Sequence, residues 1–404
     1  MDSASLFPIM SQQPAGLSGL ARMAAEAEWA EYGHQIEFRA MKVRSLLNRS
    51  VSKRLRWLAY SINPYRGCEF GCKYCYARYT HEFLAPKLED GVGVSERDGD
   101  GAVGSVPGAW KGSASIEELN LRAPEAFERR IFIKENAAWL LEQELKKIRP
   151  EEEIAIGTAT DPYQPIERRA RVTRSILEVF ARRAGHRIGL VTKSQLIERD
   201  IDLLQEIARR NTLVLHLTIT TPDATLARLL EPRAPRPDLR FEAVRRLREA
   251  GLTVGILNSP LLPGITDSAK ALDQMARQAA AVGASFLSAQ PLFLKSCSRP
   301  TYLSFVREHF PSLEADYAKR FADRDFAAPA YQRELAERVE AACKRHGLGR
   351  RSNDALLTRE IKPPDEQLQS DAPRRRYDLL EREARALKKP VQRVVVERQQ
   401  RLFA

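Results

Sequence analysis

Short β-branched runs alternate with long amphipathic segments in this 404-residue chain, and this rhythm constrains its fold more than any other feature. Several runs are apolar throughout, as expected when both faces of a parallel sheet are buried. Six or seven strand–helix units indicate an α/β fold, a partial (β/α)6-type, TIM-like barrel. The expected strands are 56–62, 130–134, 153–159, 187–193, 212–220, 252–260 and 285–293, and the expected helices are 136–148, 172–183, 200–210, 239–250 and 268–282.

Shifts in composition divide the chain into four expected parts. Residues 1–34 read as loosely ordered, and helical patterns replace strand patterns after Phe293. The glycine-rich stretch 89–115 reads as a flexible surface insertion, with a lid as the alternative. The parts are a basic N-terminal extension (1–50), the barrel with its insertion (51–295), a helical C-terminal region (296–360) and a basic tail (361–404).

The overall composition is that of a soluble globular protein, with 43% apolar and 29% charged residues. No apolar run reaches the length of about 18 residues that spans a bilayer, so we expect no transmembrane helix. The first residues lack the basic and apolar regions of a secretory signal. Five cysteines, three of them clustered, do not suggest a disulfide framework. They indicate a reducing compartment, and we expect the protein in the cytoplasm.

The net charge of +12 is concentrated in a basic strip from Arg39 to Arg56, which contains no acidic residue. Trp57, Tyr60 and Tyr65 follow it. Cations beside aromatic rings suit phosphate contacts and base stacking, so nucleic acid is a candidate partner. The alternative is a solvated basic helix on a protein that is basic overall.

Three cysteines, Cys68, Cys72 and Cys75, form a C-x3-C-x2-C run just after the first expected strand. Thiolates at such spacing favour a soft metal ion or an iron–sulfur cluster, and both ordinarily take four ligands. Three interpretations are open: a zinc site completed by His81, an electron-transfer cluster completed by Cys297 or Cys343, or a [4Fe–4S] cluster held by three thiolates. The third leaves one iron open, which separates a reactive site from a structural one.

The spacing, with an aromatic residue (Tyr74) before the last cysteine, resembles the radical S-adenosylmethionine (SAM) superfamily. The resemblance implies a partial (β/α) barrel and a [4Fe–4S] cluster whose metal ligands are Cys68, Cys72 and Cys75. It implies that SAM chelates the open iron and is cleaved by reduction to a 5′-deoxyadenosyl radical. An electron donor such as flavodoxin or ferredoxin is implied as a partner.

Further stretches resemble the superfamily branch related to spore photoproduct lyase, often described as DNA repair photolyase-like. They are IFIKENA, IAIGTATDPYQPIE, LVTKS, EPRAPRPDLR and SPLLPGITD, within about residues 60–290. In the lyase, a cysteine that donates a hydrogen atom precedes the motif that corresponds to Ala159, Thr160 and Asp161. This chain has none there, which argues against thymine-dimer repair by the lyase's own route.

Polar side chains at the ends of the expected strands are candidates for cofactor binding, because ligands of parallel α/β folds lie at that edge. By resemblance, Thr158, Thr160 and Asp161 hold the amino group of SAM, and a strand-end hydroxyl of Thr218 or Thr220 bonds its ribose. The other candidates are Lys193 and Arg233 for a carboxylate or phosphate, Asn258 at a strand end, and Tyr74 beside the cluster.

Each candidate also has a structural interpretation, such as an Asp-Pro turn, a strand-forming threonine or a lysine that extends from the edge of the core. Cys297 is a candidate catalytic donor of a hydrogen atom, and its alternative is a small buried apolar residue. The expected function is a radical SAM enzyme with an unidentified substrate, nucleic acid first, then a protein or small molecule. A non-catalytic iron–sulfur or zinc protein that binds nucleic acid is the rival.

Overall fold

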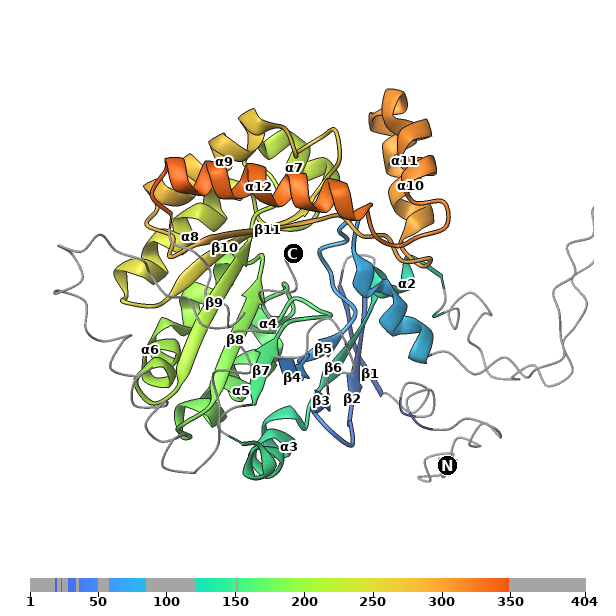
Figure 1. Cartoon of the computed structure of the whole chain (residues 1–404). Coiled ribbons are helices and arrows are strands. Elements are labelled where there is room, and N and C mark those ends of the chain that lie inside the picture. The colour runs from blue at the N-terminus through green and yellow to red at the C-terminus, as the bar shows by residue number, and fades with distance from the viewer. Residues whose placement is uncertain are drawn as a thin grey trace, which may run out of the picture.

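Six parallel strands form the main body of the computed structural model, which describes residues 28–33, 36–49, 58–84, 123–149 and 152–348, together with residues 19, 23 and 121. They lie in chain order within a seven-stranded sheet whose order is β11-β10-β9-β8-β7-β4-β3. The prediction of a partial (β/α)6-type barrel is confirmed (Figure 1). The six strands are β4 (Leu58–Ile62), β7 (Glu153–Ile156), β8 (Arg187–Thr192), β9 (Thr212–Thr218), β10 (Val254–Leu261) and β11 (Leu287–Pro291).

Helices connect the parallel strands, and each buries one stripe of side chains against the sheet. In α5, the buried Val172, Ile176 and Val179 recur at helical spacing. The strands between them are buried on both faces, which explains their uninterrupted apolar sequences. The connecting helices are α4 (Glu167–Ala170), α5 (Val172–Ala181), η4 (Gln195–Asp200), α6 (Ile201–Arg210), α7 (Ala224–Leu230), α8 (Pro237–Glu249) and α9 (Ala269–Ala281).

A second, four-stranded sheet corrects one assignment. The run RIFIK is a strand, β6 (Arg130–Lys134), but it pairs with β2 (Ile36–Met41) and β5 (Tyr65–Arg66) and not with the barrel. An apolar strand sequence does not specify its neighbours, which accounts for the error. Between β4 and β7 the chain also forms η1 (Tyr76–Leu84), α2 (Ala126–Arg129), α3 (Ala137–Glu144) and η3 (Leu145–Lys147).

The N-terminal segment contains strands that the sequence analysis missed. Strand β1 (Glu28–Gly33) pairs with β2, and β3 (Leu47–Arg49) pairs with β4, so residues 28–33 are ordered as a strand and not loose as expected. Charged residues hid this pattern in β2, where half-buried Glu37 and Arg39 alternate with buried Ile36 and Phe38. The helical alternative for the basic strip is therefore wrong over residues 39–49.

Other sequence-based expectations fall on residues that the structure does not describe. Lys53, Arg54 and Arg56, the insertion 89–115 and the tail 361–404 lie outside the described residues. Within the described residues, no helix combines the length and apolar character needed to cross a membrane.

Helices after β11 cover two parts of the molecule (Figure 1). Helix α12 (Pro329–Arg345) adds Leu335 and Ala342 to the main core, beside α9 and β11. Helices α10 (Arg299–His309) and α11 (Glu314–Arg320), joined by η5 (Pro311–Leu313), supply Tyr302, Phe305 and Tyr317 to a second core. That second core also contains the cysteine segment, so these helices shield the cysteines as well as the sheet.

Gly255 in β10 offers a test of the barrel packing. A methyl group there would overlap the ring of Phe286, which is fully buried. We expect Gly255→Ala to lower the free energy of unfolding by about 1–3 kcal/mol, the usual cost of overpacking. Urea denaturation measures this loss. Adding Phe286→Leu to Gly255→Ala should restore part of the lost free energy of unfolding. If the losses of the two single variants simply add in the double variant, the proposed overlap is contradicted.

Candidate functional site

The three cysteines lie on an irregular loop after β4 and β5, at the carboxyl edge of the parallel sheet. Two glycines shape the loop, Gly67 with φ of 83° and Gly71 with φ of 62°, a region that glycine adopts without strain. A Cβ on Gly67 would lie 2.8 Å from the carbonyl oxygens of Phe127 and Arg130. The loop can therefore follow β6 closely only because this residue has no side chain.

The cysteine side chains share a buried apolar environment. Cys68 and Cys72 are buried and Cys75 is half-buried, all within the second core. Burial, with charge from Glu231 and Cys75, raises the pKa of Cys72 to about 12. Burial and the neighbouring Asp161, Cys72 and Cys75 likewise raise the pKa of Cys68. A bound cation favours the thiolate form of Cys68 and Cys72, and the irons of a cluster would supply that charge.

Two of the side chains proposed as a fourth protein ligand, His81 and Cys343, are engaged elsewhere. His81 Nε2 lies 3.0 Å from the carbonyl oxygen of Arg130, and its ring packs on Phe127 and Phe132. Cys343 contacts the Leu287 carbonyl from α12. Across the described part of the chain, no three His, Cys, Asp or Glu side chains are grouped as ligands of one metal ion. His81 and Cys343 are therefore held by backbone carbonyl groups in this structure.

The loop between β7 and α4 holds the first part of the cysteine loop. Thr160 Oγ1 donates a hydrogen bond to the Gly67 carbonyl at 2.6 Å, and Gln164 Nε2 donates to Thr160 Oγ1 at 3.0 Å. Gln164 Oε1 accepts from the Glu69 backbone at 2.9 Å. Gln164 is fully buried. Thr160 is thus placed beside the loop as predicted, but its hydroxyl is bonded to the loop backbone.

Asp161 joins the ends of β7 and β8. Its carboxylate accepts from Thr192 Oγ1 at 2.6 Å, from the Lys193 backbone at 2.7 Å and from the Tyr163 backbone at 2.9 Å. Burial raises the pKa of this carboxyl, although these donors oppose the shift. Asp161 therefore fixes the backbone of Lys193. Thr158 Oγ1 accepts from Asn63 at 3.3 Å at the same edge.

Lys193 extends toward the cysteines. Its Nζ lies 5.8 Å from the centre of the Tyr74 ring, within range of a cation–π interaction. Burial opposes its charge, but Cys72, Glu231 and Asp161 outweigh that effect and raise the pKa of Lys193. The ammonium is therefore charged at neutral pH, at the carboxyl end of β8.

Arg233 lies on the cysteine loop. Its Nε donates to the Glu69 carbonyl, and Nη2 lies 3.3 Å from Glu128 Oε2, which also pairs with Arg78 at 3.3 Å. A Cβ on Gly71 would lie 2.6 Å from Arg233 Nη2, so this glycine makes room for the guanidinium. The bidentate ligand contact predicted for Arg233 stays a prediction; in the structure this side chain holds the loop.

A buried polar network occupies the end of β9. Tyr74 OH donates to Glu231 and lies 2.9 Å from Thr220 Oγ1, which donates to Glu231 at 2.9 Å. Glu231 forms an ion pair of 2.5 Å with Arg240, and both are almost fully buried. Burial alone would raise the pKa of Glu231, but Arg240 and Lys193 reverse this and lower it. The network fixes the aromatic residue of the cysteine motif.

The remaining strand-end candidates support this network. Asn258 Nδ2 donates to the carbonyls of Ile219 and Thr220 at 2.9 and 2.8 Å. The Thr218 carbonyl accepts from Arg240 Nη1 at 3.0 Å. The structure brings both residues to the predicted edge, and their contact with a cofactor stays a prediction.

Cys297 lies at the rim of the site. Its Sγ donates to the Tyr76 carbonyl at 3.9 Å, and the side chain is half-buried. Burial, together with Glu82 and Cys75, raises the pKa of Cys297, which keeps its S–H bond intact at neutral pH. The predicted donor is thus a protonated thiol near the last cysteine of the motif.

The family model for the radical SAM superfamily matches residues 62–276, more than half of the chain and including all three cysteines. The chain belongs to the radical SAM superfamily. Members are enzymes, and membership implies a [4Fe–4S] cluster and SAM as cofactors. The match includes the loop on which Cys68, Cys72 and Cys75 lie.

Two relatives and two solved structures are similar to this chain over much of its length. Protein Rv2578c of Mycobacterium tuberculosis is 29% identical over 307 residues, 75% of this chain and 79% of the relative. Protein MJ0683 of Methanocaldococcus jannaschii is 28% identical over 208 residues, 52% of this chain and 62% of the relative. Two variants of spore photoproduct lyase superpose with TM-scores of 0.51 and 0.50 at 16% and 15% identity. They cover 82% and 83% of this chain, and 84% and 85% of the lyase chains. At that identity the likeness shows the shared fold.

The sequence analysis missed Gln164, Glu128 and Arg240. Arg240 left a signal, because it lies on the buried stripe of α8 with Pro237, Phe241 and Val244. A cation at such a position requires a buried partner. Gln164 and Glu128 left none in a single sequence, since their roles depend on loops that meet only in the fold.

The Glu231–Arg240 pair supports a stability prediction. Arg240→Met leaves a buried carboxylate without its partner, so we expect the free energy of unfolding to fall by about 3–5 kcal/mol. Without Arg240 the folded-state pKa of Glu231 rises above its unfolded value, so the loss should be smaller at pH 5 than at pH 8. Urea denaturation at both pH values measures this. Adding Glu231→Gln to Arg240→Met should restore stability at pH 8. If the double variant loses as much stability as Arg240→Met alone, the pairing is contradicted.

Proposed function

We propose that Cys68, Cys72 and Cys75 hold a [4Fe–4S] cluster with one open iron, and that the enzyme reductively cleaves SAM to act on a substrate not yet identified. The observation that carries this proposal is the convergence of the three cysteines in one buried site at the carboxyl edge of the barrel. Charged and hydroxyl side chains from the ends of β7, β8 and β9 surround that site.

When bound, the reduced cluster and SAM together supply a 5′-deoxyadenosyl radical that abstracts hydrogen from a substrate. The residues of this chain bind, orient and shield. Cys68, Cys72 and Cys75 bind iron, while the aromatic residues of α10 and α11 exclude water from the second core. Tyr74, held by Glu231, keeps a fixed position next to the last cysteine.

Among the predicted cofactor contacts, we assign direct binding of the SAM carboxylate to Lys193. Its side chain is half-buried, and its charged ammonium faces the Tyr74 ring at 5.8 Å. Thr160, Asp161, Thr220, Arg233 and Asn258 already bond protein groups, so we assign them to positioning the cysteine loop and the strand ends. Thr158 and Thr218 remain candidates for direct contact.

Nucleic acid is the favoured substrate class, because the chain carries the basic strip from Arg39 to Arg56 and resembles spore photoproduct lyase. A protein or a small molecule is the second possibility. Cys297 is proposed as the donor that returns a hydrogen atom to the product, because its thiol is protonated and lies near Cys75. A flavodoxin or ferredoxin is the proposed electron source.

The decisive experiment is anaerobic reconstitution with iron and sulfide, followed by dithionite and SAM. We expect 5′-deoxyadenosine by chromatography, and we expect Cys68→Ala, Cys72→Ala or Cys75→Ala to abolish both it and the cluster absorbance. Cys343→Ala is the matched control and should retain both, because that thiol lies on α12. A fully loaded cluster that yields no 5′-deoxyadenosine would overturn the catalytic proposal, and cluster loss in a Cys297→Ala/Cys343→Ala variant would indicate a fourth thiolate.

Lys193→Met tests the carboxylate assignment. Loss of one charge-assisted hydrogen bond costs about 1.5–3 kcal/mol, so we expect SAM to bind about 10- to 100-fold more weakly. Electron paramagnetic resonance of the reduced cluster, titrated with SAM, measures this affinity without turnover. Lys270→Met, an exposed lysine on α9, should leave the titration unchanged. Equal SAM affinity in the Lys193 variant and the wild type would refute the assignment.

A further inference from the structure

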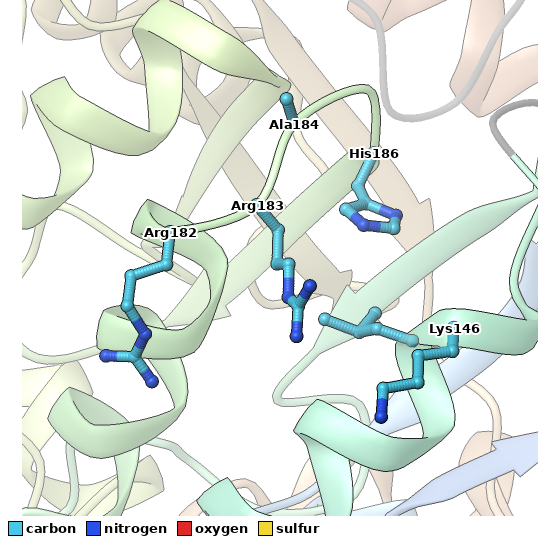
Figure 2. Close-up of a pocket in the computed structure, with 6 residues that line it drawn as sticks. Lys146, Arg182, Arg183, Ala184 and His186 are labelled. Atoms are coloured by element: carbon cyan, nitrogen blue, oxygen red, sulfur yellow. The ribbon is translucent and has the colours of Figure 1, made fainter.

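A cationic pocket opens at the amino edge of the barrel, opposite the cysteines. It has a volume of about 360 Å³ and is lined by Leu145, Lys146, Arg182, Arg183, Ala184 and His186 (Figure 2). Lys146 belongs to η3, which precedes β7, and residues 182–186 precede β8. Because parallel strands begin at the same edge, these segments meet at the end of the sheet remote from the SAM site.

The charge of this pocket is unbalanced. Three positive charges come from Lys146, Arg182 and Arg183. One negative charge comes from Glu142, whose Oε1 lies 3.3 Å from Arg182 Nη2 and 3.8 Å from Arg183 Nη2. Burial and the adjacent Arg183 lower the pKa of His186, so its ring is neutral at pH 7. The three cations and Glu142 together give the pocket a local charge of +2.

Two nitrogen atoms of the pocket have no hydrogen-bond partner, and one of them, Arg183 Nε, is a donor. Arg183 Nε and His186 Nδ1 are shielded from water and have no hydrogen-bond partner within the described residues. A buried donor left without a partner destabilises the folded protein, and a ligand oxygen would supply that partner. In Figure 2, the Arg183 side chain extends between those of Arg182 and Lys146, so a modest rotation of this long side chain presents its nitrogens to a ligand.

We propose that this pocket binds a phosphate group carried by a larger molecule. A phosphate monoester bears about −1.5 to −2 charge at pH 7, which matches the local +2, and its oxygens suit donors that approach from several directions. A carboxylate would neutralise half of that charge. The volume exceeds a bare phosphate and lies in the range of about 300–1,000 Å³ usual for ligand pockets.

The phosphate can come from a phosphorylated small molecule or from a nucleic-acid backbone, and both share the chemistry that the pocket recognises. Isothermal titration of the reconstituted protein with inorganic phosphate, a mononucleotide and a single-stranded decanucleotide separates the sources. We expect saturable binding of at least the mononucleotide. Arg183→Gln should weaken it about tenfold or more, and Lys146→Gln, an exposed residue, should weaken it about three- to tenfold.

Matched controls keep the outcome clear. Arg338→Gln removes the same charge from exposed α12 and should leave binding unchanged, and none of these variants should alter 5′-deoxyadenosine formation. If the mononucleotide and the decanucleotide bind more tightly than inorganic phosphate by the same factor, the pocket is a site for a small molecule. A decanucleotide that binds at least tenfold more tightly, and loses this advantage in Arg183→Gln, identifies a nucleic-acid backbone. No saturable binding, or equal binding by wild type and Arg183→Gln, would overturn the proposal.

Discussion

The site depends on side chains that bond to the carbonyl groups of an irregular, buried loop. Buried backbone groups must find partners, and a loop without helix or strand ladders cannot supply them itself. Thr160 and Gln164 satisfy the Gly67 carbonyl, Arg233 satisfies that of Glu69, and Arg78 donates to that of Cys72 at 3.2 Å. The cysteine loop is therefore held by residues that follow β7 (Thr160, Gln164), by Arg78 of η1 and by Arg233, which follows α7.

The same donors set the electrostatics around the thiols. Arg78 and Arg233 share Glu128, while Arg240 pairs with Glu231. The Arg240–Glu231 pair is neutral, whereas Arg78 and Arg233 with their single carboxylate keep one positive charge. The Lys193 ammonium faces the Tyr74 ring and adds a further positive charge near Cys72. Charge, hydrogen bonds and burial are the protein's means of setting a cluster potential. Lys193 is thus the residue best placed to respond to an anionic ligand.

Much of the barrel followed from its sequence, because strands buried on both faces are apolar throughout and the helices between them are amphipathic. Strand β6 was assigned to the wrong sheet because its apolar run carries no information about neighbours. Strand β2 was missed because Glu37 and Arg39 interrupt its apolar pattern. The cysteines were predictable because their spacing reflects ligand chemistry. Gln164 was not, because its amide acts across 97 residues of chain on Gly67.

The two edges of the barrel separate two kinds of chemistry. The carboxyl edge is enclosed by α10 and α11 around the thiols, whereas the amino edge carries Lys146 and Arg183 at an open pocket. Strand β8 joins Lys193 at one edge to His186 at the other through six residues, about 20 Å at the usual rise. A phosphate at the amino edge therefore cannot contact SAM directly. Its effect on the reaction must come from holding a molecule long enough to reach around the barrel, or from a change in β8 itself.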